Sequence, residues 1–218
     1  MELFIYEHCP YCVKARMIFG LKNKPVQLCY LLNDEERAVI RMVGVKQVPV
    51  LKIASDTYMK ESLDIIRFVD ELEAPLIRGK QSAAIRDWLS RVSLSWRPLT
   101  MSHFGLLALP EFATRAAVDY YTQKKERLLG APLVQLRLKR PLYVEEINIQ
   151  LVQLVALIRS EEAVNGELSF DDFHLFAVLR ALTLFKDIRY PSKVRRYLET
   201  LSKLSQVELL FHQALAAV

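Results

Sequence analysis

Two cysteines close to the amino terminus are the residues of this sequence best suited to chemistry. Cys9 and Cys12 enclose the short run Cys9-Pro10-Tyr11-Cys12. Residues three apart share one face of a helix, and one turn brings their α-carbons near the ~5.5 Å that a disulfide requires. Because cysteine reacts as its thiolate, the pair is suited to thiol-disulfide exchange, in which one cysteine attacks and the other resolves.

The pair lies where a predicted strand gives way to a predicted helix. Pro10 suits the first helical position, because it has no amide hydrogen to leave unpaired. Cys9 then lies at the helix amino terminus, where free amides and the helix dipole favour a thiolate, so we expect its pKa to fall below the ordinary ~8.5. This placement predicts Cys9 as the nucleophile and Cys12 as the resolving cysteine.

Two cysteines at this spacing also occur in zinc sites and in protein cores. A zinc site needs further ligands, but Cys29 falls in a predicted strand and the four histidines show no close ligand spacing. We interpret Cys29 as a core residue and His8 as a solvated neighbour of Cys9. The sequence therefore favours redox chemistry over a metal site or inert packing.

The first third of the chain has the alternating pattern of a small α/β domain. Asn33 and Glu36 have the spacing of a capping box, and Gly44 marks the end of the helix that they would open. Ser55 and Asp56 separate the last two strands, which favours a hairpin. The predicted strands are residues 3–6, 26–31, 50–53 and 57–59, and the predicted helices are residues 10–19 (ended by Gly20), about 34–43 and 62–72.

The remainder of the chain is expected to be helical. Its apolar residues recur at spacings of three and four, without a convincing alternating pattern. Ser169 and Asp172 have capping-box spacing and mark the start of one helix. We therefore predict an α/β domain at residues 1–72, a linker at residues 73–81 and an all-α domain at residues 82–218.

Composition and charge bound the classes of partner. The chain has 218 residues and a formal net charge of +5, and its basic clusters at residues 137–140 and 193–196 alternate with apolar residues at helical spacing. This pattern favours solvated helix faces over a nucleic-acid surface. No segment approaches the ~20 apolar residues of a membrane span, and the amino terminus does not resemble a secretory signal. We expect no nucleic-acid or membrane partner and a cytoplasmic location, where cysteines stay reduced.

Several motifs together carry a resemblance to a known family. They are the Cys9–Cys12 run, Val48-Pro49, Glu61-Ser62-Leu63-Asp64-Ile65 and, in the helical part, Ala163-Val164-Asn165-Gly166-Glu167-Leu168-Ser169. With them the chain resembles the large bacterial glutaredoxins of the glutaredoxin 2 family, from residue 1 to about 72 and from about 163 to 210. The resemblance implies a thioredoxin-like α/β domain joined to an all-helical domain in a glutathione-transferase-like architecture, with glutathione in the cleft between them.

The resemblance also implies roles for residues near the pair. The proline matching Pro49 is cis in this family, and the Val48 backbone would bind the cysteinyl part of glutathione. Ser62 would bind the γ-glutamyl carboxylate and Glu61 the ammonium group. The alternatives are a strand-edge proline, a simple helix cap and an exposed acid, respectively. Tyr11 either lines the cleft or is an exposed spacer.

The predicted activity is glutathione-dependent reduction of protein-glutathione mixed disulfides and of protein disulfides. Glutathione is the co-substrate, and no metal or prosthetic group is expected. Small glutaredoxins carry a basic residue where this chain has Glu7 and His8. The helix terminus must then supply more of the acidification of Cys9, with Lys14 or Arg16 as remote helpers.

Other functions share this architecture. A glutathione transferase would activate glutathione itself, and a non-enzymatic interaction module would use the fold to bind another protein. A glutathione-bridged iron-sulfur carrier is a further minor option. The nucleophile discriminates among them, because a low-pKa cysteine followed by a resolving one is suited to forming mixed disulfides. By resemblance the protein is expected to be a monomer.

Overall fold

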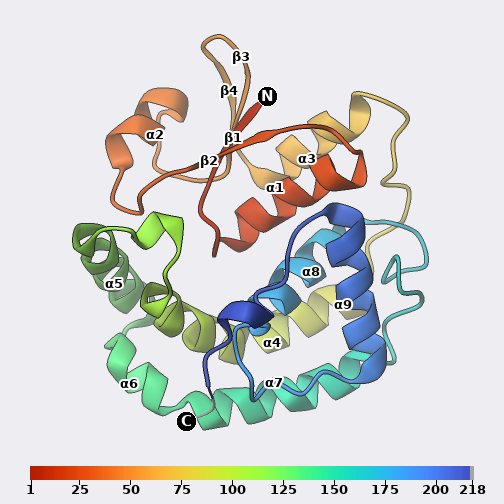
Figure 1. Cartoon of the computed structure of the whole chain (residues 1–218). Helices are drawn as coiled ribbons and strands as arrows, with labels where there is room; N and C mark the ends of the chain where they lie inside the picture. Colours follow the sequence, from red (N-terminus) through yellow and green to blue (C-terminus); the bar gives the residue numbers. More distant parts are fainter. Residues whose placement is uncertain (217–218) are drawn as a thin grey trace.

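The amino-terminal sheet contains four strands, which the computed structural model, described over residues 1–216, arranges in the order β2-β1-β3-β4. Strand β1 (Glu2–Ile5) runs parallel to β2 (Gln27–Tyr30), whereas β3 (Val50–Ala54) is antiparallel to both β1 and β4 (Thr57–Met59). The fold is the predicted thioredoxin-like α/β arrangement, and β3 with β4 forms the predicted hairpin (Figure 1).

Helix α1 (Pro10–Leu21) connects the two parallel strands and packs beside α3 (Ser62–Glu71). Gly20, predicted to end α1, lies inside it. A Cβ atom on Gly20 would lie only 1.7 Å from the backbone oxygen of Ser205 in α9 (Ser192–Ser205). The glycine therefore permits a close approach of α1 to the helical part of the chain, and it does not terminate the helix.

Helix α2 (Glu36–Val43) ends at Gly44 in the left-handed conformation, as predicted. Its predicted capping box is wrong, because Glu35 is the N-cap residue and makes no side-chain cap. The Asn33 amide instead donates a 2.9 Å hydrogen bond to the Glu111 carbonyl. Asn33 therefore joins the two parts of the molecule.

The second part of the chain is helical, as predicted (Figure 1). The predicted capping box is present at Ser169, whose amide donates to the Asp172 carboxylate at 2.8 Å. Trp88, which is fully buried, donates from its indole nitrogen to the Gln150 carbonyl. Besides α9, the helices are α4 (Ala83–His103), α5 (Arg115–Leu129), α6 (Leu133–Leu138), α7 (Arg140–Leu154) and α8 (Phe170–Leu182).

The two parts pack through α1, which contacts α8 and α9 (Figure 1). Between the end of α3 and the start of α4, residues 73–81 form neither helix nor strand. The Asp70 carboxylate holds the middle of this segment against α3 by accepting hydrogen bonds from the amides of Leu76 and Ile77. The boundaries proposed for the domains and linker stay a prediction, and residues 217 and 218 of the helical domain lie outside the described residues.

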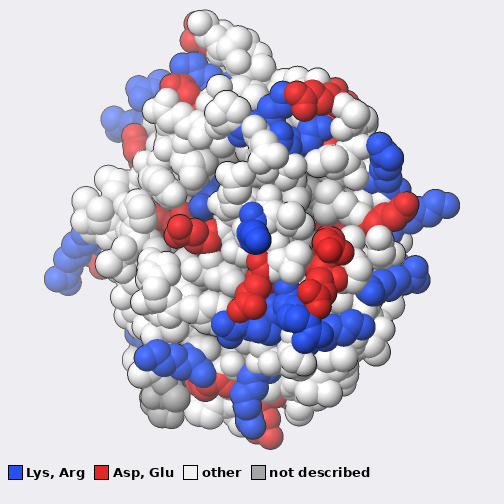
Figure 2. All heavy atoms as spheres, turned by 45° about the vertical axis from the view of Figure 1, so that its right-hand side comes forward, with Lys and Arg blue, Asp and Glu red and all other residues white. Residues whose placement is uncertain are grey.

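The basic clusters are only partly the solvated faces that were expected. Arg195 and Arg196 are exposed and pair with Glu199 and Glu161. Arg140, in contrast, is buried and forms a two-pronged ion pair with Asp187. On the face shown in Figure 2, basic and acidic side chains are interspersed. Within residues 1–216, no helix combines the length and apolar character required to cross a bilayer.

Candidate active site

The two cysteines occupy the start of α1, where the sequence placed them. Cys9 is the N-cap residue, Pro10 is the first helical residue and Cys12 is fully buried one turn further on. The chain approaches Cys9 through a tight turn, closed by a hydrogen bond from the Cys9 amide to the Tyr6 carbonyl. Both cysteines are free thiols in the structure.

The two thiols have opposite electrostatic environments. A hydrogen bond from the Cys12 thiol lowers the pKa of Cys9 to about 6, with help from the His8 charge and the Cys12 and Tyr11 amides and against the effect of burial. Burial raises the pKa of Cys12 well above its usual value, and the neighbouring Cys9 raises it further. Near neutral pH the pair therefore holds one thiolate, on Cys9, and one protonated thiol.

His8 is not the solvated neighbour that the sequence suggested. It is buried, and its Nδ1 lies 2.5 Å from Oε1 of Glu111, which also accepts the His8 amide at 3.0 Å. Glu111 lies in the short helix η2 (Pro110–Phe112) of the helical part, and its side chain is fully buried. His8 lowers the pKa of this carboxyl group even though burial raises it. An ionised carboxylate without solvent needs a counter-charge, so we treat the contact as an ion pair.

An aromatic cluster surrounds the His8 ring. The ring stacks on Tyr6 and Phe112 at centroid separations of 5.9 and 5.1 Å, and Tyr121 meets it edge-on at 5.3 Å. This packing fixes the imidazole beside the cysteines without adding another charge. The helical part thus supplies both the counter-charge and much of the enclosure for a residue next to Cys9.

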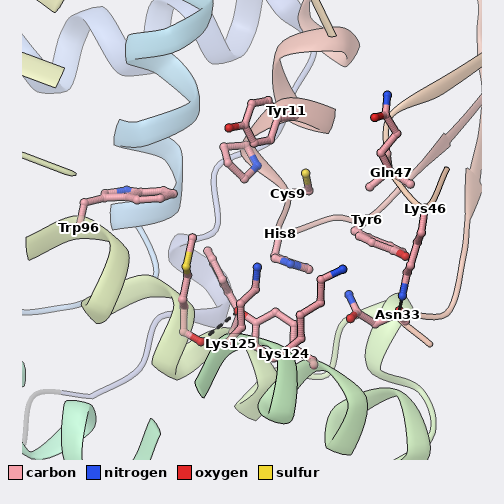
Figure 3. A pocket seen from close by; sticks show the side chains of 15 residues that line it. Tyr6, His8, Cys9, Tyr11, Asn33, Lys46, Gln47, Trp96, Lys124 and Lys125 are labelled. Atoms are coloured by element: carbon pink, nitrogen blue, oxygen red, sulfur yellow. Dashed lines mark hydrogen bonds between the residues drawn. The ribbon is translucent and has the colours of Figure 1, made fainter. Parts of the chain in front are cut away.

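A cleft of about 200 Å³ opens between the two parts of the molecule at Cys9 (Figure 3). Of the residues predicted to contact glutathione, Tyr11 and Val48 line this cleft. The Val48-Pro49 peptide bond is cis, as the resemblance implied. Tyr11 combines both of its predicted descriptions, because it lines the cleft and is 57% exposed.

Glu61 and Ser62 lie beside the cleft and do not line it. Ser62 is buried at the first position of α3, and its hydroxyl makes no cap of that helix. Glu61 precedes it with a φ of +67° and is exposed. The Glu61 carboxylate accepts a 3.1 Å hydrogen bond from Gln47, which does line the cleft. Gln47 therefore connects this helix start to the site.

Three lysines that sequence reasoning did not assign give the cleft a positive charge. Lys46 extends from the segment before β3, while Lys124 and Lys125 rise from α5 toward Cys9 (Figure 3). Burial lowers the pKa of Lys46 to about 8, and it also lowers the pKa of Lys125. The Lys46 amine lies 3.6 Å from the centroid of the Tyr120 ring. The cleft is suited to a ligand with carboxylates.

The suggested remote helpers have different surroundings. Arg16 donates to both carboxylate oxygens of Glu7 at 2.8 Å, so its charge is already paired. Lys14 is buried next to the cysteine pair, and Cys9 partly offsets the effect of burial on its pKa. Of the two, Lys14 is the one that acts electrostatically on the site.

Cys29 lies on β2, an edge strand of the sheet, and is only half-buried, so its interpretation as a core residue was too strong. Among residues 1–216, no three His, Cys, Asp or Glu side chains gather in a group that could hold a metal ion. In this part of the chain, neither Cys29 nor any histidine therefore lies with the cysteine pair in a group of possible metal ligands.

Two protein-family models match this chain. A model described as the glutathione S-transferase N-terminal domain matches residues 3–76. A second model, described as the glutaredoxin 2 C-terminal domain, matches residues 84–214. The second match alone covers more than half of the chain.

Individual relatives agree with these matches. Glutaredoxin 2 of Escherichia coli K12 is 46% identical over 216 residues, covering 99% of this chain and 100% of the relative. The crystal structure of glutaredoxin 2 from Salmonella typhimurium, solved in complex with glutathione, superposes with a TM-score of 0.95 at 43% identity and covers 98% of both chains. A glutathione S-transferase of Ceriporiopsis subvermispora, at 14% identity and a TM-score of 0.67, shares the fold and covers 97% of this chain and 95% of its own.

Proposed function

This chain belongs to the glutaredoxin 2 family, and we propose that it is a glutathione-dependent oxidoreductase whose substrates are protein-glutathione mixed disulfides. Cys9 is the proposed nucleophile. The observation that carries the proposal is the contrast between the two thiols, in which Cys9 has a pKa of about 6 and Cys12 is held protonated. A thiolate present near neutral pH is the attacking species in disulfide exchange.

In the proposed reaction the Cys9 thiolate attacks the glutathionyl sulfur of the mixed disulfide. A new bond joins Cys9 to that sulfur, and the bond to the protein sulfur breaks, so the protein leaves as a thiolate that is protonated by solvent. A glutathione thiolate then attacks the Cys9-glutathione bond, which releases oxidised glutathione and restores the Cys9 thiolate. Overall, one glutathione thiol is oxidised and the protein sulfur is reduced to a thiol, while the other glutathionyl sulfur stays at the disulfide level.

Protein disulfides require the second cysteine. After Cys9 has formed a mixed disulfide with the protein, Cys12 loses its proton and attacks Cys9, which releases the second protein thiolate. One glutathione thiolate then opens the Cys9-Cys12 disulfide by bonding to Cys9, and a second attacks that new bond, which releases oxidised glutathione and restores both cysteines. The buried position of Cys12 one helical turn from Cys9 supports this resolving role.

We propose that glutathione lies in the cleft beside Cys9. The Val48 backbone would bind its cysteinyl part in a strand-like manner, Ser62 and Glu61 would bind its γ-glutamyl end, and Tyr11 would cover its thiol. The crystallised Salmonella relative was solved with glutathione, and the positive charge of the cleft suits the two carboxylates of this tripeptide. Glutathionylated and disulfide-containing proteins are the proposed substrates, with the enzyme acting as a cytoplasmic monomer.

The test is glutathione-dependent reduction of a small mixed disulfide, coupled to glutathione reductase, by the wild type and the variants Cys9→Ser and Cys12→Ser. We expect turnover by the wild type and Cys12→Ser and none by Cys9→Ser. Reduction of a protein disulfide should be lost in both variants. Equal inactivity of all three proteins on the small mixed disulfide would sink the proposal and favour a non-enzymatic interaction module.

The proposed glutathione contacts are tested separately by kinetics. Ser62→Ala should raise the KM for glutathione by about tenfold, because it removes one charge-assisted hydrogen bond. Ser55→Ala, in the exposed turn of the hairpin, is the matched control and should leave KM unchanged. An unchanged KM in Ser62→Ala would show that Ser62 has only a structural role.

A further inference from the structure

A second cleft, of about 500 Å³, adjoins the first on the far side of Tyr11. It lies between α1 and the helices α4, α5 and α8. Tyr11, Trp96 and Lys125 line both clefts, so the two are continuous, but Cys9 lines only the first. Figure 3 shows Trp96 and Lys46 on opposite sides of Cys9. The nucleophile therefore lies in the first of two adjoining clefts.

The second cleft is cationic and partly apolar. Lys14, Arg97 and Lys125 line it, whereas no Asp or Glu within the described chain does. Trp96 and Leu89 are among its apolar lining residues. A ligand that complements this surface carries a negative charge next to an apolar group.

Lys14 is the feature of this cleft that points to a missing anion. Only 5% of this residue is exposed. The buried arginines Arg140 and Arg180 each pair with a carboxylate, but no Asp or Glu among residues 1–216 pairs with Lys14. Its amine instead lies 3.3 Å from Nδ1 of His174. A buried cation without an anionic partner is energetically costly.

The surroundings of Lys14 explain how it is tolerated in the resting enzyme. Burial lowers the pKa of Lys14 to about 8 and that of His174 to about 4, so the imidazole is a neutral acceptor for the amine. The Lys14 amine also lies 4.6 Å from the centroid of the Tyr11 ring. The Cys9 thiolate is an anion that acts electrostatically on both Lys14 and Lys125, raising the pKa of each. When Cys9 forms a mixed disulfide, this negative charge disappears.

We propose that the second cleft binds the polypeptide part of the disulfide substrate and selects chains with an acidic residue next to the reacting cysteine. This inference rests on the proposed function, because it assigns glutathione to the first cleft. A carboxylate of the substrate replaces the charge that Cys9 loses in the first step. The neighbouring apolar side chains of the substrate pack on Trp96 and Leu89. The substrate class is therefore glutathionylated proteins with an acidic, partly apolar segment around the modified cysteine.

The test uses three glutathionylated peptides of equal length, whose cysteine is flanked by Glu, by Lys or by Gln. The wild type should have a kcat/KM about tenfold higher for the Glu peptide than for the Lys peptide, with the Gln peptide between them. This preference should decrease as salt is added. Equal kcat/KM for the three peptides would overturn the inference.

Charge reversal then locates the preference. Arg97→Glu changes an exposed residue of the cleft and should abolish or invert the ratio of kcat/KM for the Glu and Lys peptides. Arg91→Glu makes the same change at an exposed position of the same helix outside the cleft, and it should keep the ratio. Loss of the preference in both variants would overturn the inference, because it would indicate a general charge effect. Lys14→Met, checked for folding by circular dichroism, should also reduce the ratio.

A mixed disulfide of glutathione with a small uncharged thiol separates the two hypotheses. If the wild type reduces it and shows no preference among the peptides, the acidic-substrate inference fails and the proposed function stands. If the wild type reduces neither the small mixed disulfide nor the peptides, the proposed function itself fails.

Discussion

Glu7 and His8 are neighbours in the chain, yet each binds a different region of the helical domain. The Glu7 carboxylate accepts from Arg16 of α1, from the Tyr30 hydroxyl and from Arg180 of α8. Arg180 also donates to the Glu7 carbonyl. Burial opposes ionisation of Glu7, but Arg180 and Arg16 outweigh it and keep its pKa below the usual value. The Glu7 carboxylate thus pairs with Arg16 of its own domain and with Arg180 of the helical domain.

The contact of His8 has a different consequence. Its polar contact with the helical domain is the one to Glu111, but it also borders the cleft and lowers the pKa of Cys9. The turn before Cys9 therefore divides two tasks between consecutive residues. The Glu7 cluster mainly stabilises the domain interface, and the His8-Glu111 pair mainly stabilises the thiolate. Variants of the Glu7 cluster should therefore change mainly the free energy of unfolding, and variants of the His8-Glu111 pair should change mainly the pKa of Cys9.

The largest effect on stability is expected for Arg180→Met. Arg180 is buried, so its loss leaves the Glu7 carboxylate with one fewer cation and should reduce the free energy of unfolding by ~3–5 kcal/mol. The pKa of Cys9 should stay near that of the wild type. Urea denaturation measures the first quantity and the pH dependence of thiolate ultraviolet absorbance the second. Arg180→Lys, which keeps the charge, should recover part of the stability; a large shift in the Cys9 pKa would contradict the division of tasks.

The depressed pKa of Cys9 makes the stability of the protein depend on pH. The pKa of Cys9 is about 6 in the folded protein, below the 9.0 of an unperturbed cysteine, which applies to the unfolded chain. Between these values the unfolded chain binds the additional proton, so stability rises with pH by ~1.4 kcal/mol per pH unit and this contribution is lost as pH falls through 6. The slope should be shallower in Cys9→Ser over pH 6–8.5. Parallel curves for the two proteins would show that Cys9 has no depressed pKa.

Glu111→Gln tests the role of the His8-Glu111 pair. The amide keeps an acceptor for His8 but removes the negative charge, so we expect the Cys9 pKa to rise by about one unit and stability to fall by ~1–3 kcal/mol. Thiolate absorbance and urea denaturation measure these effects. His8→Gln should raise the Cys9 pKa similarly, and the double variant should add little, since the residues act as a pair. Additive effects would argue against a coupled pair.

The local features of the site could be predicted from the sequence, but its contacts between the domains could not. The cysteine pair, the first helix and the cis Val48-Pro49 bond were predicted because local pattern and family motifs specify them. His8 was misinterpreted because its partner, Glu111, lies 103 residues away and forms no motif with it. Such a contact exists only once the domains have packed.

Some missed site residues had a local signal. Lys46 and Gln47 directly precede Val48, so their place at the cleft follows from the strand that they introduce. Lys124 and Lys125 form a basic doublet on a predicted helix, but periodicity alone does not say which helix faces the cysteines. The relative placement of helices, and with it the electrostatics of the cleft, was the part that the sequence left undetermined.

The smallest effect is expected for Tyr30→Phe, which removes one hydrogen bond from the Glu7 cluster. The Tyr30 hydroxyl donates to Glu7 at 2.8 Å, but the side chain is exposed and water can replace it. The free energy of unfolding should therefore fall by no more than ~1 kcal/mol, with no change in the Cys9 pKa. Tyr58→Phe, on β4 of the same sheet, is a control without a described partner for its hydroxyl among residues 1–216. Tyr30→Phe could instead lower the free energy of unfolding as much as Arg180→Met does. The Glu7 carboxylate would then depend on its hydroxyl partner as much as on its cations, because the two arginines alone would not account for the stability of the interface.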